Sequence, residues 1–305
     1  MTGAGWTDWA VFASVLGALL GIDLVSHRKG REQSQKAALF WSLIWISAGL
    51  LFAFYVWVRL GRGAGEEYLA AYFIEKSLSL DNLFVFLLIF QSLRIPRENQ
   101  HTVLLWGIFG ALVFRAVAVV VGVAALSRFT WVQYVFASIL LLAAVAAFRK
   151  NPAHGGPPRL LKVLARRFPV RAKAAGNRFF VRQNGTICAT PLLLALVTIE
   201  LTDIVFAIDS VPAALSVTRQ EFLVYSSNAF AILGLRSLYL LLAGTIATMR
   251  YLHHGIGFVL AFAATKMLLD GWVEIPPALS AGIVLTAIAA AVGASVIKAR
   301  ITAAQ

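Results

Sequence analysis

The sequence is poor in charged residues and in the side chains that form disulfides or bind soft metals. Charged residues make up 13% of the 305 positions, against about 25% in soluble globular proteins. The single cysteine, Cys188, excludes an intrachain disulfide and a cysteine-based metal cluster. The five histidines form no His-x-x-x-His pair on a helix. No nucleotide-binding motif occurs, so ATP is not expected to drive the protein directly.

Long apolar runs fill most of the chain, and 60% of its residues are hydrophobic. A helix of about twenty apolar residues crosses a bilayer, so the runs predict an all-α polytopic membrane protein with a single transmembrane domain, residues 1–305. Residues 1–5 contain no basic residue, unlike a signal peptide, and we expect the first run to be retained. About nine transmembrane helices are predicted, at residues 7–26, 38–58, 68–93, 103–125, 130–148, 187–211, 222–246, 254–271 and 278–297.

Basic residues are divided unequally between the two ends of these spans. Nineteen lysines and arginines fall in the loops on one side, whereas the other side has only Arg59, Arg62, Arg128 and Arg219. By the positive-inside rule, this bias predicts that the N-terminus is outside and the C-terminus is cytoplasmic.

The long loop at residues 149–186 contains ten of these basic residues and no acidic one. Apolar residues recur at helical spacing between the basic residues over 159–168, which predicts a short amphipathic helix lying on anionic lipid headgroups. The topology accounts for the positive charge of the chain, so no nucleic-acid partner is expected.

Two of the predicted spans contain acidic motifs. In the third span, Glu75 is followed six positions later by Asp81 and Asn82, and in the sixth, Asp203 is followed by Asp209 and Ser210 with the same spacing. The next span in each half carries one arginine, at position 115 or 236. This repetition predicts two repeats, residues 66–148 (spans 3–5) and 187–271 (spans 6–8). The predicted topology makes them inverted, which places a site at the bilayer midplane between them.

The motif spacing leaves the local helix geometry open. Glu200 and Asp203 are three residues apart and share a helix face. Residues six apart are displaced by about 120° around a helix, so either each helix presents two faces to the site or it is unwound near the motif. Pro191 and Pro212 in the sixth span make a distortion plausible.

A charge at the bilayer centre costs at least ~2.5–3.5 kcal/mol on insertion scales, so these carboxylates need partners. Carboxylates with Ser79, Asn82, Thr202 and Ser210 nearby offer hard oxygen ligands, which suit Mn²⁺, Mg²⁺ or Ca²⁺. The alternative is that the carboxylates form structural ion pairs with the nearby cations, which are Lys76, Arg115, Arg236 and Lys266. The Gly-x-Gly-Asp signature of intramembrane aspartyl proteases is absent, and no enzymatic activity is expected.

Four motifs resemble the TerC family of integral membrane proteins, and within it the Alx-type manganese exporters. They are EKSLSLDNLFV at residues 75–85, FFVRQNG at 179–185, ELTDIVFAIDSVP at 200–212 and SNAFAILGLR at 227–236. The resemblance implies export of divalent metal, chiefly manganese. It implies metal binding by Glu75, Asp81, Glu200, Asp203 and Asp209, with Asn82 and Ser210 as candidate additional ligands. One departure is Ala146, where relatives often have a lysine that mirrors Lys266.

The hypothesis is therefore an exporter of divalent cations, with Mn²⁺ as the transported ion and no permanent cofactor, in the bacterial cytoplasmic membrane. Protonation of the carboxylates on the outer side would release the ion. Homo-oligomerisation is left open by the sequence. The alternative is a membrane scaffold, biogenesis factor or tellurite-resistance protein that does not transport.

Overall fold

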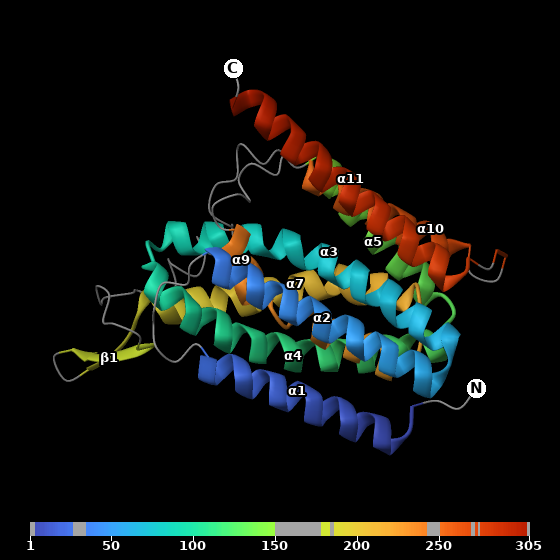
Figure 1. Cartoon of the computed structure of the whole chain (residues 1–305), viewed down its shortest axis with the longest axis horizontal. Helices are drawn as coiled ribbons and strands as arrows, with labels where there is room; N and C mark the ends of the chain where they lie inside the picture. The colour runs from blue at the N-terminus through green and yellow to red at the C-terminus, as the bar shows by residue number, and fades with distance from the viewer. Residues whose placement is uncertain are drawn as a thin grey trace.

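The computed structural model describes residues 4–26, 35–149, 178–183, 186–242, 251–269, 272–273 and 275–303 (Figure 1). The side chains of Asp81 and Asp209 are outside this description, although the backbone of each lies within a helix. The elements are α1 (Trp6–Ser26), α2 (Gln35–Leu60), α3 (Arg62–Ser92), α4 (Arg97–Arg128), α5 (Val132–Arg149), β1 (Phe180–Gln183), β2 (Thr186–Ala189), α7 (Pro191–Leu215), α8 (Glu221–Ile232), α9 (Leu235–Leu242), α10 (Leu252–Leu268) and α11 (Pro277–Ala303).

The prediction of an all-α membrane protein is confirmed at the level of class. Five of the described helices are long and apolar enough to cross a membrane, namely Trp6–Leu24, Gln35–Leu60, Arg97–Arg128, Val132–Arg149 and Ala278–Lys298. Helices α3 and α7, which carry the acidic motifs, are not among these five. Every predicted span overlaps a helix, and the range 222–246 is shared between α8 and α9.

A two-stranded antiparallel hairpin precedes α7 and was not predicted. It pairs β1 with β2, so residues 187–189 belong to a strand and not to the predicted sixth span. Helix α7 begins at Pro191, where the missing N–H would have had no helical partner. The residue before a proline favours extended backbone, and Thr190 adopts it, with φ −98° and ψ 165°. The predicted amphipathic helix at 159–168 lies outside the described residues.

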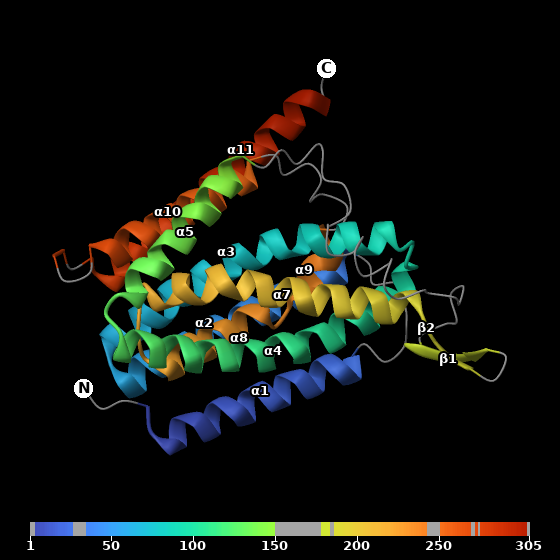
Figure 2. The ribbon, with the colours of Figure 1, turned by 180° about the vertical axis from the view of Figure 1, so that it is seen from behind.

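The helices form two groups that are visible from both sides of the molecule (Figures 1 and 2). Helices α2, α3, α4, α7 and α8 form a bundle, with α1 at its edge. Helices α5, α10 and α11 pack together, and α11 also packs along α3.

Contacts between helices α3–α5 and helices α7–α10 follow a regular pattern. The packing of α3 against α8 has a counterpart in the packing of α7 against α4. Likewise, the contact of α5 with α7 has a counterpart in the contact of α10 with α3. Three further pairs, α3 with α7, α4 with α8 and α5 with α10, join corresponding members of the two sets, and α9 also contacts α3 and α4. Helices α3 and α7 run in opposite directions (Figure 1).

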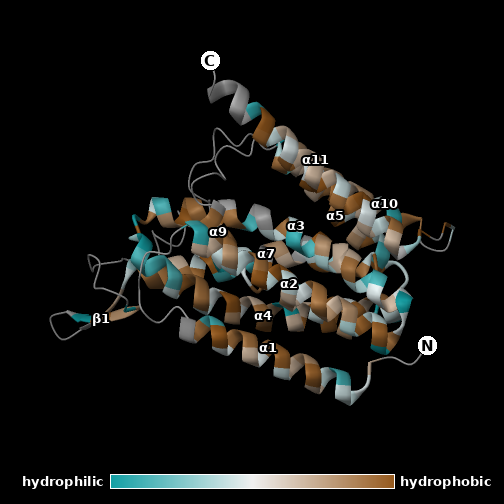
Figure 3. Ribbon diagram, in the orientation of Figure 1, coloured by the Kyte–Doolittle hydropathy of each residue, from teal (hydrophilic) through white to brown (hydrophobic). Residues whose placement is uncertain are grey.

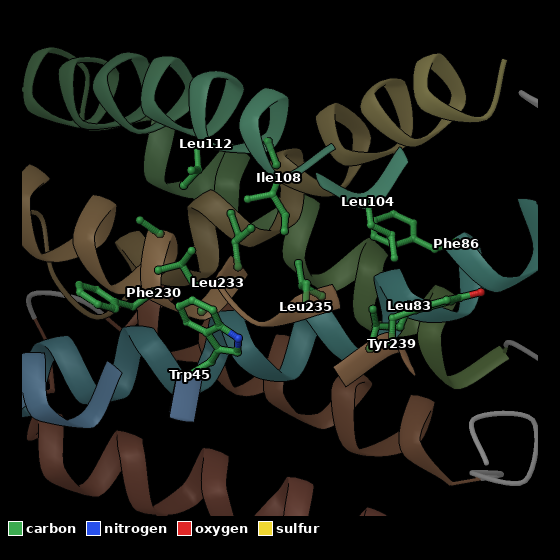
Figure 4. Packing of buried hydrophobic residues seen from close by; sticks show 14 of the residues in the cluster. Trp45, Leu83, Phe86, Leu104, Ile108, Leu112, Phe230, Leu233, Leu235 and Tyr239 are labelled. Atoms are coloured by element: carbon green, nitrogen blue, oxygen red, sulfur yellow. The ribbon is translucent and has the colours of Figure 1, made fainter. Parts of the chain in front are cut away.

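Hydrophobic residues predominate along the helices of the bundle (Figure 3), and they occur both buried in the interior and exposed on the outer faces. In the interior, Phe52 stacks on Phe230 with ring centroids 4.6 Å apart, within a cluster that includes Trp45 (Figure 4). On the outer faces, Leu51 is 69% exposed and Leu142 is 71% exposed. Apolar residues around the whole helix are typical of membrane-embedded helices.

The seventh predicted span is broken between α8 and α9. Gly234 has φ +82°, and a Cβ atom there would lie 2.5 Å from Trp45 Cβ. The Lys76 ammonium donates to the carbonyls of Ala231 at 3.0 Å and Leu233 at 3.4 Å. These bonds supply donors to carbonyls at the end of α8 that lack a helical partner. By contrast, α3 and α7 are continuous through the acidic motifs, so the unwinding considered for them is not observed.

We expect Gly234→Ala to destabilise the fold by roughly 2–5 kcal/mol, because it combines an unfavourable φ with overpacking against Trp45. Thermal unfolding of the purified protein in detergent, followed by tryptophan fluorescence, measures the change. The control is Gly282→Ala on α11, where nothing lies within 4 Å of the added Cβ. The control is expected to be neutral or to stabilise by up to about 1 kcal/mol. Equal melting temperatures for the two variants would contradict the role of Gly234.

Candidate functional site

Arg115, near the middle of α4, is the centre of a buried polar network and is only 1% exposed. Its Nη1 donates to Glu75 Oε1 on α3 and to Asn228 Oδ1 on α8, the latter at 3.1 Å. Its Nε and Nη2 donate to the two carboxylate oxygens of Asp203 on α7, at 3.4 and 3.2 Å. One guanidinium therefore holds the two predicted repeats together at their acidic motifs.

The amide of Asn228 closes the network. Its Nδ2 donates to Glu75 Oε2 at 3.0 Å, so both oxygens of that carboxylate have a donor. Glu75, Asp203 and Asn228 are all buried. Such a network is stable in a low-dielectric interior only when its members are satisfied, as they are here.

Glu200 lies one turn before Asp203 but does not join the network. Its carboxylate packs against α4 at Gly110, where an added Cβ would lie 2.1 Å from both Oε1 and Oε2. Glu200 Oε2 is buried and has no hydrogen-bond partner among the described residues. The absence of a side chain at Gly110 thus makes room for a carboxylate oxygen that is available to a ligand.

The predicted additional oxygen ligands differ in their environment. Ser79 and Ser210 are buried, and their hydroxyl oxygens have no partner within the described part of the chain. Asn82 is also buried. Thr202, in contrast, donates to the carbonyl of Thr198 at 2.6 Å and bonds within its own helix.

Of the four predicted charge-compensating cations, Arg115 alone is recorded in contact with the described site carboxylates. Lys76 donates to the end of α8, as described above. Lys266 donates to Ser280 at 3.0 Å and lines a different pocket, together with Glu67 and Arg219. Arg236 pairs with Asp23 of α1 at 3.5 Å.

Arg236 and Asp203 line one small cavity of about 20 Å³. This volume is enough for about one water molecule. The other residues around the cavity are apolar, among them Phe86, Leu104 and Leu235 (Figure 4).

Among the described side chains, no three acidic, histidine or cysteine residues are placed to hold a metal ion. Arg115 lies between Glu75 and Asp203, which accounts for the absence of a preassembled cluster there. The ion pairs expected under the structural alternative therefore exist for these two carboxylates. The proposed metal ligation by the five acidic residues stays a prediction.

Sequence reasoning missed Asn228 as a site residue. An asparagine within the apolar range 222–246 is a recognisable signal, because a buried amide needs hydrogen-bond partners. The sequence did not indicate which partners it finds, since Glu75 is 153 positions away.

Comparison with known proteins gives relatives of nearly full length. An uncharacterized membrane protein of Myxococcus xanthus is 43% identical over 96% of this chain and 92% of its own length. The putative membrane-bound redox modulator Alx of Escherichia coli K12 is 38% identical over 90% of both chains. An uncharacterized membrane protein of Rickettsia bellii is 36% identical over 96% of this chain and 98% of its own length.

No solved structure matches the chain. The sequence profile of the integral membrane protein TerC family matches residues 60–303, which include both acidic motifs, the arginines at 115 and 236, and Asn228. The chain therefore belongs to the TerC family of integral membrane proteins.

Proposed function

We propose that the protein exports a divalent cation, with Mn²⁺ as its cargo, across the bacterial cytoplasmic membrane. The observation that carries this proposal is the guanidinium of Arg115 between Glu75 and Asp203. Carboxylates buried among apolar helices need a cation, and Arg115 supplies one from within the chain. The same carboxylates, freed from Arg115, offer the hard oxygen ligands that Mn²⁺ prefers.

Charge balance favours an exchange between Arg115 and the cargo. Glu75, Asp203 and Glu200, when ionised, carry three negative charges against the one positive charge of Arg115, so the site attracts a further cation. Glu200 contributes an oxygen that has no described partner, so within the site itself its carboxylate is available to an arriving ion before those of Glu75 and Asp203. The ion then competes with Arg115 for Glu75 and Asp203. Asp81 and Asp209 are proposed to complete the ligand set.

The pattern of helix contacts supports inverted repeats. If α3 is matched with α7, α4 with α8–α9 and α5 with α10, each contact between the two sets has a counterpart in which the two partners are swapped. In transporters with inverted repeats, rocking of one repeat against the other exposes a midplane site to each side in turn. Glu75 and Asp203 belong to different repeats under this proposal, so rocking changes their separation and the fit of Arg115 between them.

Transport is tested first at the two aspartates whose side chains are outside the described part. Asp81→Ala and Asp209→Ala are each expected to raise cellular manganese by removing a ligand from the transport site. The measurement is metal content, by mass spectrometry, of manganese-loaded cells in which each variant is the sole copy. Glu66→Gln serves as a control, because Glu66 pairs with the exposed Arg62 at a helix end. Unchanged manganese in both alanine variants, at normal protein levels, would favour a scaffold without transport.

Gly110→Ala tests Glu200 without changing any charge. The added Cβ takes the position of the Glu200 carboxylate, and we expect Mn²⁺ affinity to fall about 10- to 100-fold, as for loss of one charge-assisted contact. Calorimetric titration of the purified protein with MnCl₂ measures the affinity. Gly122→Ala is the matched control, because its Cβ meets apolar side chains of the same helix α7, Leu215 at 2.9 Å and Val211 at 3.3 Å.

If Gly110→Ala acts through Glu200, the double variant with Glu200→Gln will bind Mn²⁺ no more weakly than Glu200→Gln alone. Additive losses of Mn²⁺ affinity in the double variant would contradict a ligand role for Glu200. So would a loss of affinity in Gly122→Ala as large as that in Gly110→Ala.

Arg115→Gln separates exchange from a purely structural ion pair. Breaking a buried pair costs about 3–5 kcal/mol, so we expect the metal-free variant to melt at a lower temperature. Under exchange, Mn²⁺ no longer competes with the guanidinium, so its affinity rises and it restores much of the lost stability, while export falls. Melting curves with and without MnCl₂ measure this. Destabilisation that Mn²⁺ does not relieve would identify Arg115 as structural only.

A further inference from the structure

A second buried ion pair lies between the carboxylate site and one end of the bundle. Arg236, at the start of α9, donates from Nη1 to Asp23 Oδ2 at 3.5 Å, and both side chains are buried. Asp23 is close to the C-terminal end of α1. The pair therefore joins the edge helix α1 to the short helix that follows the break at Gly234.

The small cavity described above connects this pair to the site. Among the described residues that line it, Asp203 and Arg236 are the charged ones, and the other side chains are apolar. Phe86 lies in the last part of α3, Leu104 in the first part of α4, and Arg236 at the start of α9. These helix ends lie at the same end of the bundle (Figure 1). The predicted topology places that end in the cytoplasm.

Arg236 is held much less firmly than Arg115. Arg115 forms four hydrogen bonds with described partners. Arg236 forms one hydrogen bond with a described partner, at 3.5 Å, and its buried Nε has no partner among the described residues. A buried guanidinium with so few partners gains little from its present position, so its displacement costs less than that of Arg115.

The break between α8 and α9 provides a hinge for this displacement. Gly234 has a backbone conformation that L-residues rarely adopt, and it lies two residues before Arg236. Lys76 anchors the α8 side of the break through the carbonyls of Ala231 and Leu233. Movement of α9 about Gly234 would carry Arg236 away from both Asp23 and the cavity, while α8 and Asn228 stay in place.

We propose that the Asp23–Arg236 pair is the cytoplasmic gate of the carboxylate site. In the closed state Arg236 caps the cavity that leads to Asp203, and when the pair separates, water and cations from the cytoplasm reach the site. Asp23 is then the first carboxylate met by an entering cation. The proposal rests on the proposed function for the identity of the cargo, but the closure itself is testable without transport.

Cysteine accessibility measures this closure. In a Cys188→Ser background, Leu104→Cys places one thiol on the cavity wall, where the native side chain is 4% exposed. The probe is a membrane-impermeant methanethiosulfonate reagent applied to inside-out and right-side-out membrane vesicles. Asp23→Asn is expected to raise the modification rate about tenfold or more in inside-out vesicles, by increasing a minor open population, and to leave it unchanged in right-side-out vesicles.

Asp8→Asn is the matched control. Asp8 is a buried carboxylate at the other end of α1, and it also pairs with an arginine, Arg59, at 3.5 Å. The Asp8→Asn variant is expected to leave the modification rate of the cysteine at position 104 unchanged. An unchanged rate in Asp23→Asn, or an equal increase in Asp8→Asn, would overturn the gate.

Two further measurements complete the test. The charge-swapped variant Asp23→Arg/Arg236→Asp is expected to restore slow modification, and a fast rate in a folded swap would count against the pair. Added MnCl₂ is expected to protect the cysteine when the site behind the gate is filled. If Asp23→Asn is modified faster but Mn²⁺ gives no protection, the gate is supported and the proposed Mn²⁺ site is contradicted. Failure of the gate and failure of the proposed function are therefore distinguishable.

Discussion

The contact of Arg115 with Glu75 and Asp203 is the constraint on which the rest of the structure depends. A carboxylate inside an apolar bundle is costly unless it is paired and hydrogen-bonded, and a guanidinium offers five donors in one plane. Here four of the bonds made by those donors reach three side chains on three other helices. The same interaction therefore compensates the buried charge and fixes how α3, α4, α7 and α8 pack around the middle of the bundle.

The sequence was sufficient to locate most of the helices, because a chain in lipid must satisfy its backbone polar groups within each helix. Apolar runs therefore mark the helices, and their ends differ from the prediction by up to six residues. The break at Gly234 was not predictable in this way. Glycine is common within transmembrane helices, and only the close approach of Trp45 and the bonds from Lys76 show why the helix stops there.

The site was predictable as a set of residues and less so as a set of contacts. The spacing correctly placed Glu200 and Asp203 on neighbouring turns, yet one packs against Gly110 and the other bonds to Arg115. Lys76 follows Glu75 directly in the sequence, but successive side chains on a helix point in different directions. Its ammonium consequently meets backbone carbonyls and not the neighbouring carboxylate. Such partners depend on tertiary packing, which spacing along one helix does not determine.

Under the proposed function, the two buried arginines combine a closed resting state with ready opening. Strong compensation is needed where two carboxylates face each other, and there Arg115 has many partners. At the Asp23 pair, a similarly strong network would make entry of an ion slow, because every bond would have to break without replacement. Under the proposed gate, the 3.5 Å contact of Arg236 with Asp23, close to Gly234, keeps apolar residues closed around the cavity at a smaller cost of opening than the network of Arg115. On this view, unequal bonding of the two arginines allows the gate to open before the site gives up its internal cation.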